Sequence, residues 1–155
     1  MSRDTRIIDA PVEDTWAVLA DGWLYPSWVV GASRMRRVNE DWPATGAELH
    51  HSVGTWPVLI DDTTTVLASE PPHHLQLRVR AWPGGEGEVD LHLQSLPGPV
   101  HRTQVIMTEK PVAGPGRWIP RPLTEAALHL RNQESLQRLA FLAEGRRDPA
   151  RQPVR

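Results

Sequence analysis

The chain has 155 residues, which is enough for one domain with its own hydrophobic core. Its 17 basic and 19 acidic residues nearly balance and the basic ones form no long run, so we expect no nucleic-acid partner. The absence of cysteine excludes disulfides, thiolate nucleophiles and cysteine zinc sites. No apolar run is long enough for a signal peptide or a membrane span, so we expect a cytoplasmic protein, a monomer or a homodimer.

The first part of the chain predicts one strand followed by two short helices. In the first helix Val12, Trp16 and Leu19 recur at helical spacing, so they share one face. Gly22 is expected to close this helix, because glycine tolerates the left-handed conformation that stops a helix. The second helix contains the sequence YPSW. The strand is expected at residues 5–9 and the helices at 12–21 and 23–30.

From residue 33 onward the apolar pattern changes its period from 3.6 to 2, which predicts strands separated by turns rich in Pro and Gly. A proline-rich link then leads to a long helix from about residue 123 to 144, which Gly145 is expected to end. Residues 146–155 are interpreted as a polar C-terminal tail. The predicted strands are residues 33–40, 47–53, 58–69, 74–82, 87–96 and 102–110.

The long helix carries an apolar stripe that must be buried, and the sheet is the only large partner available. We therefore predict an α+β fold in which a curved antiparallel sheet of about seven strands wraps around the C-terminal helix. Asn132 lies in the middle of the stripe, where an amide needs a hydrogen-bond partner. The apolar members of the stripe are Leu128, Leu136, Leu139 and Ala143.

Several sequence segments resemble a known superfamily. IDAPVEDTWAVLAD followed by YPSW resembles the opening of the START-like, helix-grip proteins (SRPBCC), and TQVIMTEKP with LRNQESLQRLAFLAEG resembles their polyketide cyclase/dehydrase and lipid-transport branch. The resemblance extends from about Thr5 to Gly145. It implies a single ligand-binding domain over residues 1–145, with an apolar cavity between sheet and helix. Such domains include ligand carriers and aromatase/cyclases, so the fold does not decide the activity.

Two histidines and two aspartates flank the turn GTWP, residues 54–57. Adjacent strand residues point to opposite faces, so His50 and His51 cannot chelate one ion together, nor can Asp61 and Asp62. We expect no metal site and no cofactor. A four-residue loop would pair His50 with Asp61 on the outer face and make His51 and Asp62 diagonal neighbours on the inner face. We expect His51 to point toward the long helix and His50 away from it.

The next hairpin supports the same assignment of faces. With residues 82–86 as the loop, apolar residues oppose apolar ones and arginines oppose carboxylates. On the last strand we take Val105 and Met107 as inward, which carries Glu109 toward the rim of the cavity. The inner set is Leu75, Leu77, Val79, Val89, Leu91 and Leu93, and the outer set is Arg78, Arg80, Glu88 and Asp90.

Three functions remain open. The first is binding of a hydrophobic or aromatic small molecule, lipid- or polyketide-like, in the internal cavity. The second is a cyclase or dehydratase in which His51 acts with Asp62 or Glu109 as acid–base groups. The third is a groove that grips a partner protein. The expected binding residues are Trp28, Leu77, Val79, Leu91, Val105, Met107 and Leu136, with polar anchors at His51, Asp62, Glu109 and Asn132.

The polar anchors also have structural interpretations. His51 is either a satisfied core histidine or a polar contact for a ligand, and a buried imidazole N–H needs a partner, for which Asp62, Glu109 and Asn132 are candidates. Glu109 can pair with an arginine at the rim instead of acting as a base. Asn132 can bond to backbone beneath the helix.

Overall fold

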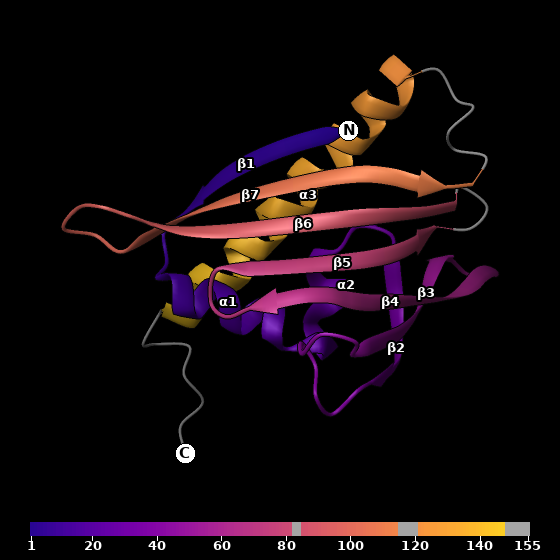
Figure 1. Cartoon of the computed structure of the whole chain (residues 1–155), viewed down its shortest axis with the longest axis horizontal. Helices are drawn as coiled ribbons and strands as arrows, with labels where there is room; N and C mark the ends of the chain where they lie inside the picture. Colours follow the sequence, from indigo (N-terminus) through magenta and orange to yellow (C-terminus); the bar gives the residue numbers. More distant parts are fainter. Residues whose placement is uncertain (82–84, 115–120, 148–155) are drawn as a thin grey trace.

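The fold consists of one antiparallel sheet and a small set of helices (Figure 1). The computed structural model describes residues 1–81, 85–114 and 121–147. The strands are hydrogen-bonded in the order β1-β7-β6-β5-β4-β3-β2. The elements are β1 (Ser2–Ile8), α1 (Val12–Ala20), η1 (Gly22–Leu24), α2 (Tyr25–Trp28), β2 (Ala32–Val38), β3 (Glu48–Thr55), β4 (Val58–Glu70), β5 (His74–Ala81), β6 (Gly85–Leu96), β7 (Arg102–Ala113) and α3 (Arg121–Arg147).

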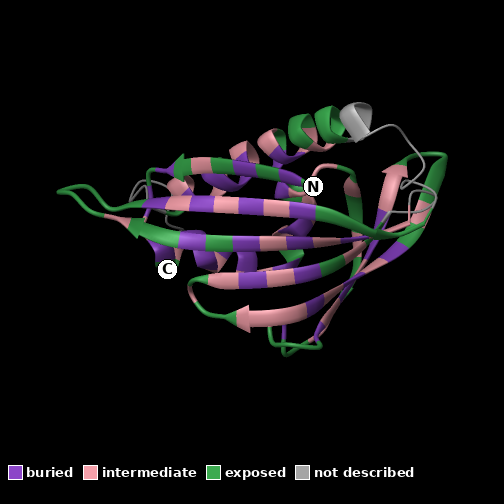
Figure 2. Ribbon diagram, turned by 45° about the horizontal axis from the view of Figure 1, so that its top comes forward, coloured by how far each residue is buried: buried purple, intermediate pink, exposed green. Residues whose placement is uncertain are grey.

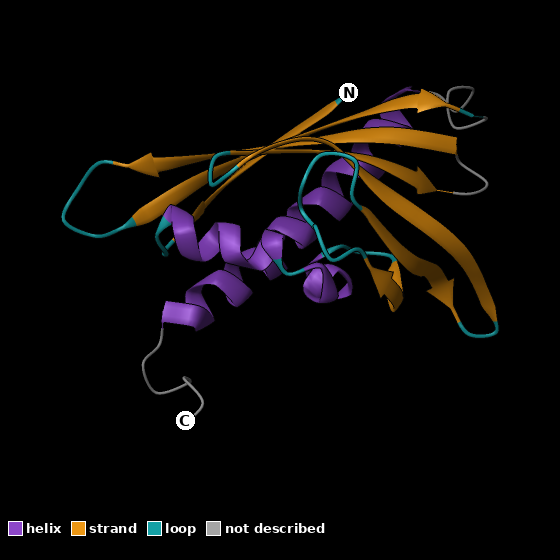
Figure 3. Ribbon diagram, turned by 60° about the horizontal axis from the view of Figure 1, so that its bottom comes forward, coloured by secondary structure: helices purple, strands orange, loops and turns teal. Residues whose placement is uncertain are grey.

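The helices all lie on one side of the curved sheet, and α3 crosses beneath it (Figure 3). α3 packs against β1 and against both α1 and α2, so it is held on several sides. This arrangement confirms the predicted helix-grip fold, including the two short helical segments that follow the first strand. None of the helices in the described part of the chain is long and apolar enough to cross a bilayer.

Burial alternates along the strands, as expected for a sheet with one face against the core (Figure 2). Leu77, Leu91 and Leu93 are buried, whereas Arg78 and Arg80 are exposed, so the predicted assignment of faces is confirmed for them. Leu75 and Val89 of the inner set are buried as well, and Val79, Glu88 and Asp90 are of intermediate exposure. The core therefore lies between the inner face and the helices. Its fully buried large side chains include Ile8, Val18, Leu19, Leu49, Leu136 and Leu139.

The predicted register of both hairpins is wrong by two residues. In the β3–β4 hairpin Thr55 pairs with Val58, which leaves only Trp56 and Pro57 in the turn. Gly54 has a φ of 105°, in a region that L side chains rarely adopt, and a Cβ there would lie 2.5 Å from the carbonyl oxygen of Val58. The glycine thus lets the pairing continue up to Thr55, closer to the turn than predicted.

The β5–β6 pairing also continues further than predicted, since Arg80 pairs with Glu86 and Ala81 with Gly85. The residues between them, 82–84, lie outside the described part of the chain. A shift of two residues changes every partner but keeps every side chain on its face, because the strand repeat is two. The predicted faces therefore hold although the predicted partners do not.

Gly22 and Gly145, which were expected to end helices, do not end them. Gly22 begins η1, and it is required by packing: a Cβ there would lie 2.7 Å from side-chain atoms of Leu49 and Val38. Gly145 lies inside α3, which continues to Arg147, since a glycine costs a helix only about 1 kcal/mol. The predicted tail therefore begins inside this helix, and its residues 148–155 lie outside the described part of the chain.

Candidate functional site

A cavity of about 80 Å³ lies at the junction of α2, the sheet and α3. Its walls are mainly apolar, with a few polar side chains among them. Two lining residues, Gly31 and Arg80, are exposed, which places them at the outer end of the cavity. The described lining residues are Tyr25, Trp28, Val29, Val30, Gly31, Ala32, His51, Val53, Leu77, Val79, Arg80, Val89, Met107, Arg131 and Ser135.

The short helix α2 supplies the two aromatic rings of the wall. Tyr25 and Trp28 are three residues apart, so they emerge from the same side of the helical turn. Their ring centroids are 5.6 Å apart with the planes at 73°, an edge-to-face arrangement, and both residues are buried. The backbone N–H of Val30 donates to the Ser135 hydroxyl at 3.2 Å. This bond fixes the segment after α2 on the long helix.

A buried hydrogen-bonded chain links β3, β4 and α2 at the cavity wall. The Nε2 atom of His51 lies 3.0 Å from the Thr64 hydroxyl oxygen, which in turn lies 3.1 Å from the Tyr25 hydroxyl. The His51 and Tyr25 rings are also in contact, with centroids 5.1 Å apart. The inward orientation predicted for His51 is confirmed, because it is buried and lines the cavity. Its partner is Thr64, and none of the three predicted partners.

The three hydrogen-bonded side chains, His51, Thr64 and Tyr25, are uncharged at pH 7. Burial disfavours the imidazolium and lowers the pKa of His51 to about 4. Burial likewise raises the pKa of Tyr25 to about 12, so its hydroxyl keeps its proton. The Ser52 backbone acts against the lowering of the His51 pKa, but no group of the described residues reaches the His51 Nδ1 atom with hydrogen-bond geometry. Nδ1 is a donor or an acceptor according to the tautomer, and a polar atom of a ligand can form the missing hydrogen bond with it.

Asp62 lies beside His51 but is used differently. The two residues are directly paired across β3 and β4, not diagonal as predicted. Asp62 Oδ1 accepts from the Thr63 backbone N–H at 2.7 Å, whereas its buried Oδ2 has no partner in the described part of the chain. Burial raises the pKa of Asp62. Asp62 is not among the residues that line the cavity.

The outer pair predicted for this hairpin does not form. His50 lies 3.4 Å from a Glu48 oxygen, and Asp61 accepts from Ser52 at 3.0 Å and pairs with Arg36. The changed register explains this, because Asp61 opposes Ser52 instead of His50. His50 is nevertheless on the outer face, as predicted.

Glu109 and Asn132 belong to a second polar cluster and do not line the cavity, although Arg131, which contacts both, does. Glu109 is buried and pairs with Arg131 of α3. Of its two predicted roles, the structure therefore shows the ion pair with an arginine. The Asn132 amide donates to Asp4 of β1 at 3.3 Å, so its partner is a side chain and not backbone. Asp4 is fully buried and also accepts from Ser2 and Gln133. This cluster joins β1 to α3.

The structure brings together only part of the predicted binding set. Trp28, His51, Leu77, Val79 and Met107 line the cavity. The other members lie elsewhere in the interior, either in the packed core or in the polar clusters described above. They are Asp62, Leu91, Val105, Glu109, Asn132 and Leu136.

The sequence interpretation missed several residues of the site, and three of them carry hydroxyl groups. Tyr25 precedes Trp28 by three residues and Ser135 follows Asn132 by three, so helical spacing alone places each beside a residue already chosen. Thr64 follows Asp62 by two residues, which places it on the same inner face. All three could have been found by extending the faces already assigned.

Comparison of the chain with sequence families identifies its relatives. Residues 2–144 match the family described as polyketide cyclase / dehydrase and lipid transport. The chain belongs to this family. The predicted superfamily is thereby confirmed as well. No curated protein matches the chain.

Several solved structures share the fold of this chain. The Zhui aromatase/cyclase from Streptomyces sp. R1128 has 17% identity and a TM-score of 0.69, over 97% of both chains. A conserved protein from Geobacillus kaustophilus has 15% identity and a TM-score of 0.69, over 92% of this chain and 93% of that chain. DynU16, from the dynemicin biosynthetic locus, has 23% identity and a TM-score of 0.63 over 92% of this chain, which matches 46% of that longer chain. At these identities the likeness establishes the fold alone.

Proposed function

We propose that the protein binds a hydrophobic or aromatic small molecule, lipid- or polyketide-like, in the cavity beneath α2. The observation that carries the proposal is a buried imidazole, His51, whose Nδ1 atom lacks a partner in the described structure while its ring lines an apolar cavity. Small-molecule sites commonly combine apolar walls with a few polar groups that orient the ligand. Membership of a cyclase and lipid-transport family supports the same class of ligand.

The size of the cavity limits the ligand that fits without movement. Pockets for drug-sized ligands measure about 300–1,000 Å³, whereas this cavity measures about 80 Å³. A ligand larger than one small ring therefore requires part of the wall to move. The segment 29–32 is the natural candidate, since it is short and its Gly31 is exposed at the outer end; its movement would break the Val30–Ser135 hydrogen bond that holds it on α3.

The geometry favours binding over acid–base catalysis. A cyclase or dehydratase of the kind considered above needs a carboxylate within reach of His51, and both groups must face the ligand. His51 bonds to Thr64, Glu109 is paired with Arg131, and Asp62 is absent from the lining. The partner-groove alternative is also disfavoured, because α3 of the chain itself lies against the inner face of the sheet.

A pair of ligands that differ by one hydroxyl tests the proposal: naphthalene and 1-naphthol, titrated by fluorescence or calorimetry. We expect 1-naphthol to bind more tightly, because its hydroxyl forms a hydrogen bond with the Nδ1 atom of His51. One hydrogen bond is worth about 1 kcal/mol, or roughly fivefold in affinity. His51→Phe should abolish this preference and keep naphthalene binding. The same change at His50, on the outer face, is the matched control and should leave both affinities unchanged.

A second variant tests the place of binding. Val79→Phe adds a ring at the cavity wall and should weaken both ligands, whereas Val58→Phe, at an exposed position of β4, should weaken neither. Thermal unfolding of each variant checks that the fold survives. Equal effects at His51 and His50, or no saturable binding of either naphthalene or 1-naphthol, would contradict the proposal.

A further inference from the structure

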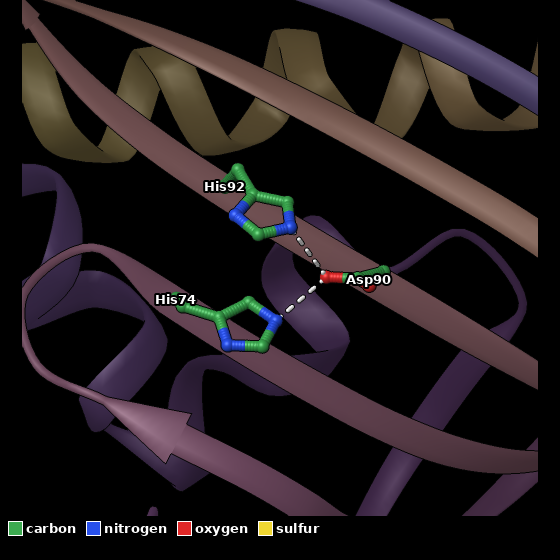
Figure 4. Close-up of side chains that lie close together, drawn as sticks. All are labelled: His74, Asp90 and His92. Carbon is green, nitrogen blue, oxygen red and sulfur yellow. Dashed lines mark hydrogen bonds and ion pairs between the residues drawn. The ribbon is translucent and has the colours of Figure 1, made fainter.

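Three potential metal ligands meet on the outer face of the sheet, away from the cavity (Figure 4). His74 begins β5, and Asp90 and His92 lie on β6. Each offers one ligand atom, and the three atoms all lie within 4.8 Å of one another. None of these residues lines the cavity beneath α2. The cluster is therefore separate from the proposed binding site.

The sheet register creates this cluster. His74 and His92 are directly paired across β5 and β6, and Asp90 precedes His92 by two residues, so all three side chains share one face. Their neighbours Leu75 and Leu91 point to the opposite face and are buried in the core. Core packing therefore holds the two strands in register and fixes which face carries the imidazoles.

The distances between the ligand atoms suit a metal ion. The Asp90 Oδ1 atom lies 2.8 Å from His74 Nε2 and 3.1 Å from His92 Nε2. With metal–ligand bonds of about 2.0–2.2 Å, neighbouring ligand atoms lie about 2.8–3.1 Å apart in an octahedral site and about 3.3–3.6 Å apart in a tetrahedral one. The rings are stacked, with centroids 4.4 Å apart and planes at 10°, and both Nε2 atoms contact the same Asp90 oxygen. An ion can bind after small adjustments of the side chains.

The surroundings also favour a cation. Among the described residues Asp90 forms ion pairs with these two imidazoles alone, so no arginine or lysine neutralises it. Glu70 on β4 lies opposite His74 in the strand register, so its carboxylate adds a second negative charge to the same face of the sheet. The side chains of His74, Asp90 and His92 are 17%, 34% and 50% exposed, which leaves a path for an ion from solvent.

We propose that His74, Asp90 and His92 bind a divalent first-row transition metal ion of the Zn²⁺ type. Two imidazole nitrogens and one carboxylate form a donor set that suits Zn²⁺, Co²⁺ or Ni²⁺ better than Mg²⁺ or Ca²⁺, which prefer oxygen ligands. Three protein ligands leave a fourth position for water. The proposal replaces the expectation of no metal site, which rested on spacing along the chain and did not consider ligands from two paired strands.

A purely structural cluster is the competing interpretation, because two N–H···O hydrogen bonds to Asp90 account for the same distances. Calorimetric titration of metal-free, tag-free protein with Zn²⁺ separates the two. We expect one saturable site per chain, and at least about tenfold weaker binding in His92→Ala and in Asp90→Asn, since loss of even an outer-shell partner costs about 10- to 100-fold in metal affinity. His50→Ala removes another imidazole of the outer face and should leave the affinity unchanged.

Co²⁺ provides an independent readout, because its visible absorption reports the ligands around the ion. We expect a spectrum that His74→Ala and His92→Ala each alter and that His50→Ala does not. All these side chains lie on the outer face, so the variants should keep the thermal unfolding midpoint of metal-free wild type to within a few degrees. Equal Zn²⁺ affinity in wild type and His92→Ala, an equal loss in His50→Ala, or no saturable binding would overturn the proposal.

Discussion

The inner side of the sheet holds two polar clusters that differ in how completely they are satisfied. At one end Asp4 lies under α3 and accepts hydrogen bonds from Ser2, Asn132 and Gln133. At the other end His51 bonds to Thr64 through one ring nitrogen, and its second ring nitrogen has no partner in the described structure. Both Asp4 and His51 are buried, and His51 lines the cavity beneath α2, whereas Asp4 is not among the described residues that line it.

This difference separates polar groups that hold the fold together from polar groups that are available to a ligand. A buried polar atom without a partner costs about 1–3 kcal/mol, so a fold retains one mainly where something else completes it. The Asp4 cluster needs no further partner, and its burial therefore indicates a structural role. The His51 cluster does need one, which is why we place the ligand there.

The largest effect is expected at the satisfied cluster. Burial alone would raise the pKa of Asp4, but the hydrogen bonds from Ser2, Gln133 and Asn132 outweigh it and hold the pKa below its usual value, so the carboxylate is charged at pH 7. Asp4→Ala removes the acceptor of the buried Ser2 and Asn132 donors and of the half-buried Gln133. We expect the free energy of unfolding to fall by about 3 kcal/mol or more, measured by urea denaturation.

Asp41→Ala is the matched control, because it removes the same side chain from an exposed position. It should change the free energy of unfolding by less than about 0.5 kcal/mol. A loss below about 1 kcal/mol for Asp4→Ala would mean that the cluster at this end is not what joins β1 to α3.

The unsatisfied cluster should instead determine the response of stability to pH. The folded protein protonates His51 with a pKa of about 4, whereas the unfolded chain does so near the ordinary 6.5. Between these values the unfolded chain binds more protons, so the free energy of unfolding falls as the pH is lowered from 6.5 to 4. At 1.36 kcal/mol per pKa unit the loss approaches about 3 kcal/mol at the acid end.

His51→Phe isolates this contribution, since the variant has no imidazole to titrate at that position. Urea denaturation between pH 7 and pH 4 should show a smaller loss of stability in the variant than in the wild type. Burial raises the pKa of Asp62, so the contribution of Asp62 to stability increases as the pH falls, opposite to that of His51. Asp62 is present in both proteins, so its contribution cancels in the difference between them. Parallel pH profiles would contradict a buried, neutral His51.

The sequence was sufficient for the faces of the sheet but not for the partners across it. A strand places alternate residues on alternate faces whatever its register, so Leu77, Leu91 and His51 were assigned correctly from apolar alternation. Register depends on where each turn closes. Gly54 adopts a positive φ and shortens the first turn, and nothing in the apolar pattern distinguishes two turn residues from four.

Only part of the site could be predicted, because the sequence indicates which residues face inward but not which of them border the cavity. His51 could be found because an imidazole interrupts an otherwise apolar face, and Trp28, in the predicted second helix, was also among the expected binding residues. Which inward residues border the cavity and which pack in the core depends on how α2 and α3 sit on the sheet. Leu91 alternates along its strand as Leu77 does, and Leu136 lies on the apolar stripe of α3, yet both are buried and neither is among the lining residues. The metal cluster was missed because its ligands come from two strands.

The smallest effect is expected on the outer face, where a carboxylate has several partners but remains close to water. Lys110 holds the pKa of Glu88 below its usual value, with help from Arg78, so this carboxylate, like Asp4, has more than one partner. Both cations are about half exposed, and exposed ion pairs contribute about 0–1 kcal/mol. Lys110→Met keeps most of the apolar stem and should therefore lower the free energy of unfolding by less than about 1 kcal/mol, and by still less in about 1 M salt, where charges are screened. Urea denaturation at low and high salt measures this directly. A loss as large as that of Asp4→Ala would show that the number of partners, and not burial, makes a polar cluster important for stability.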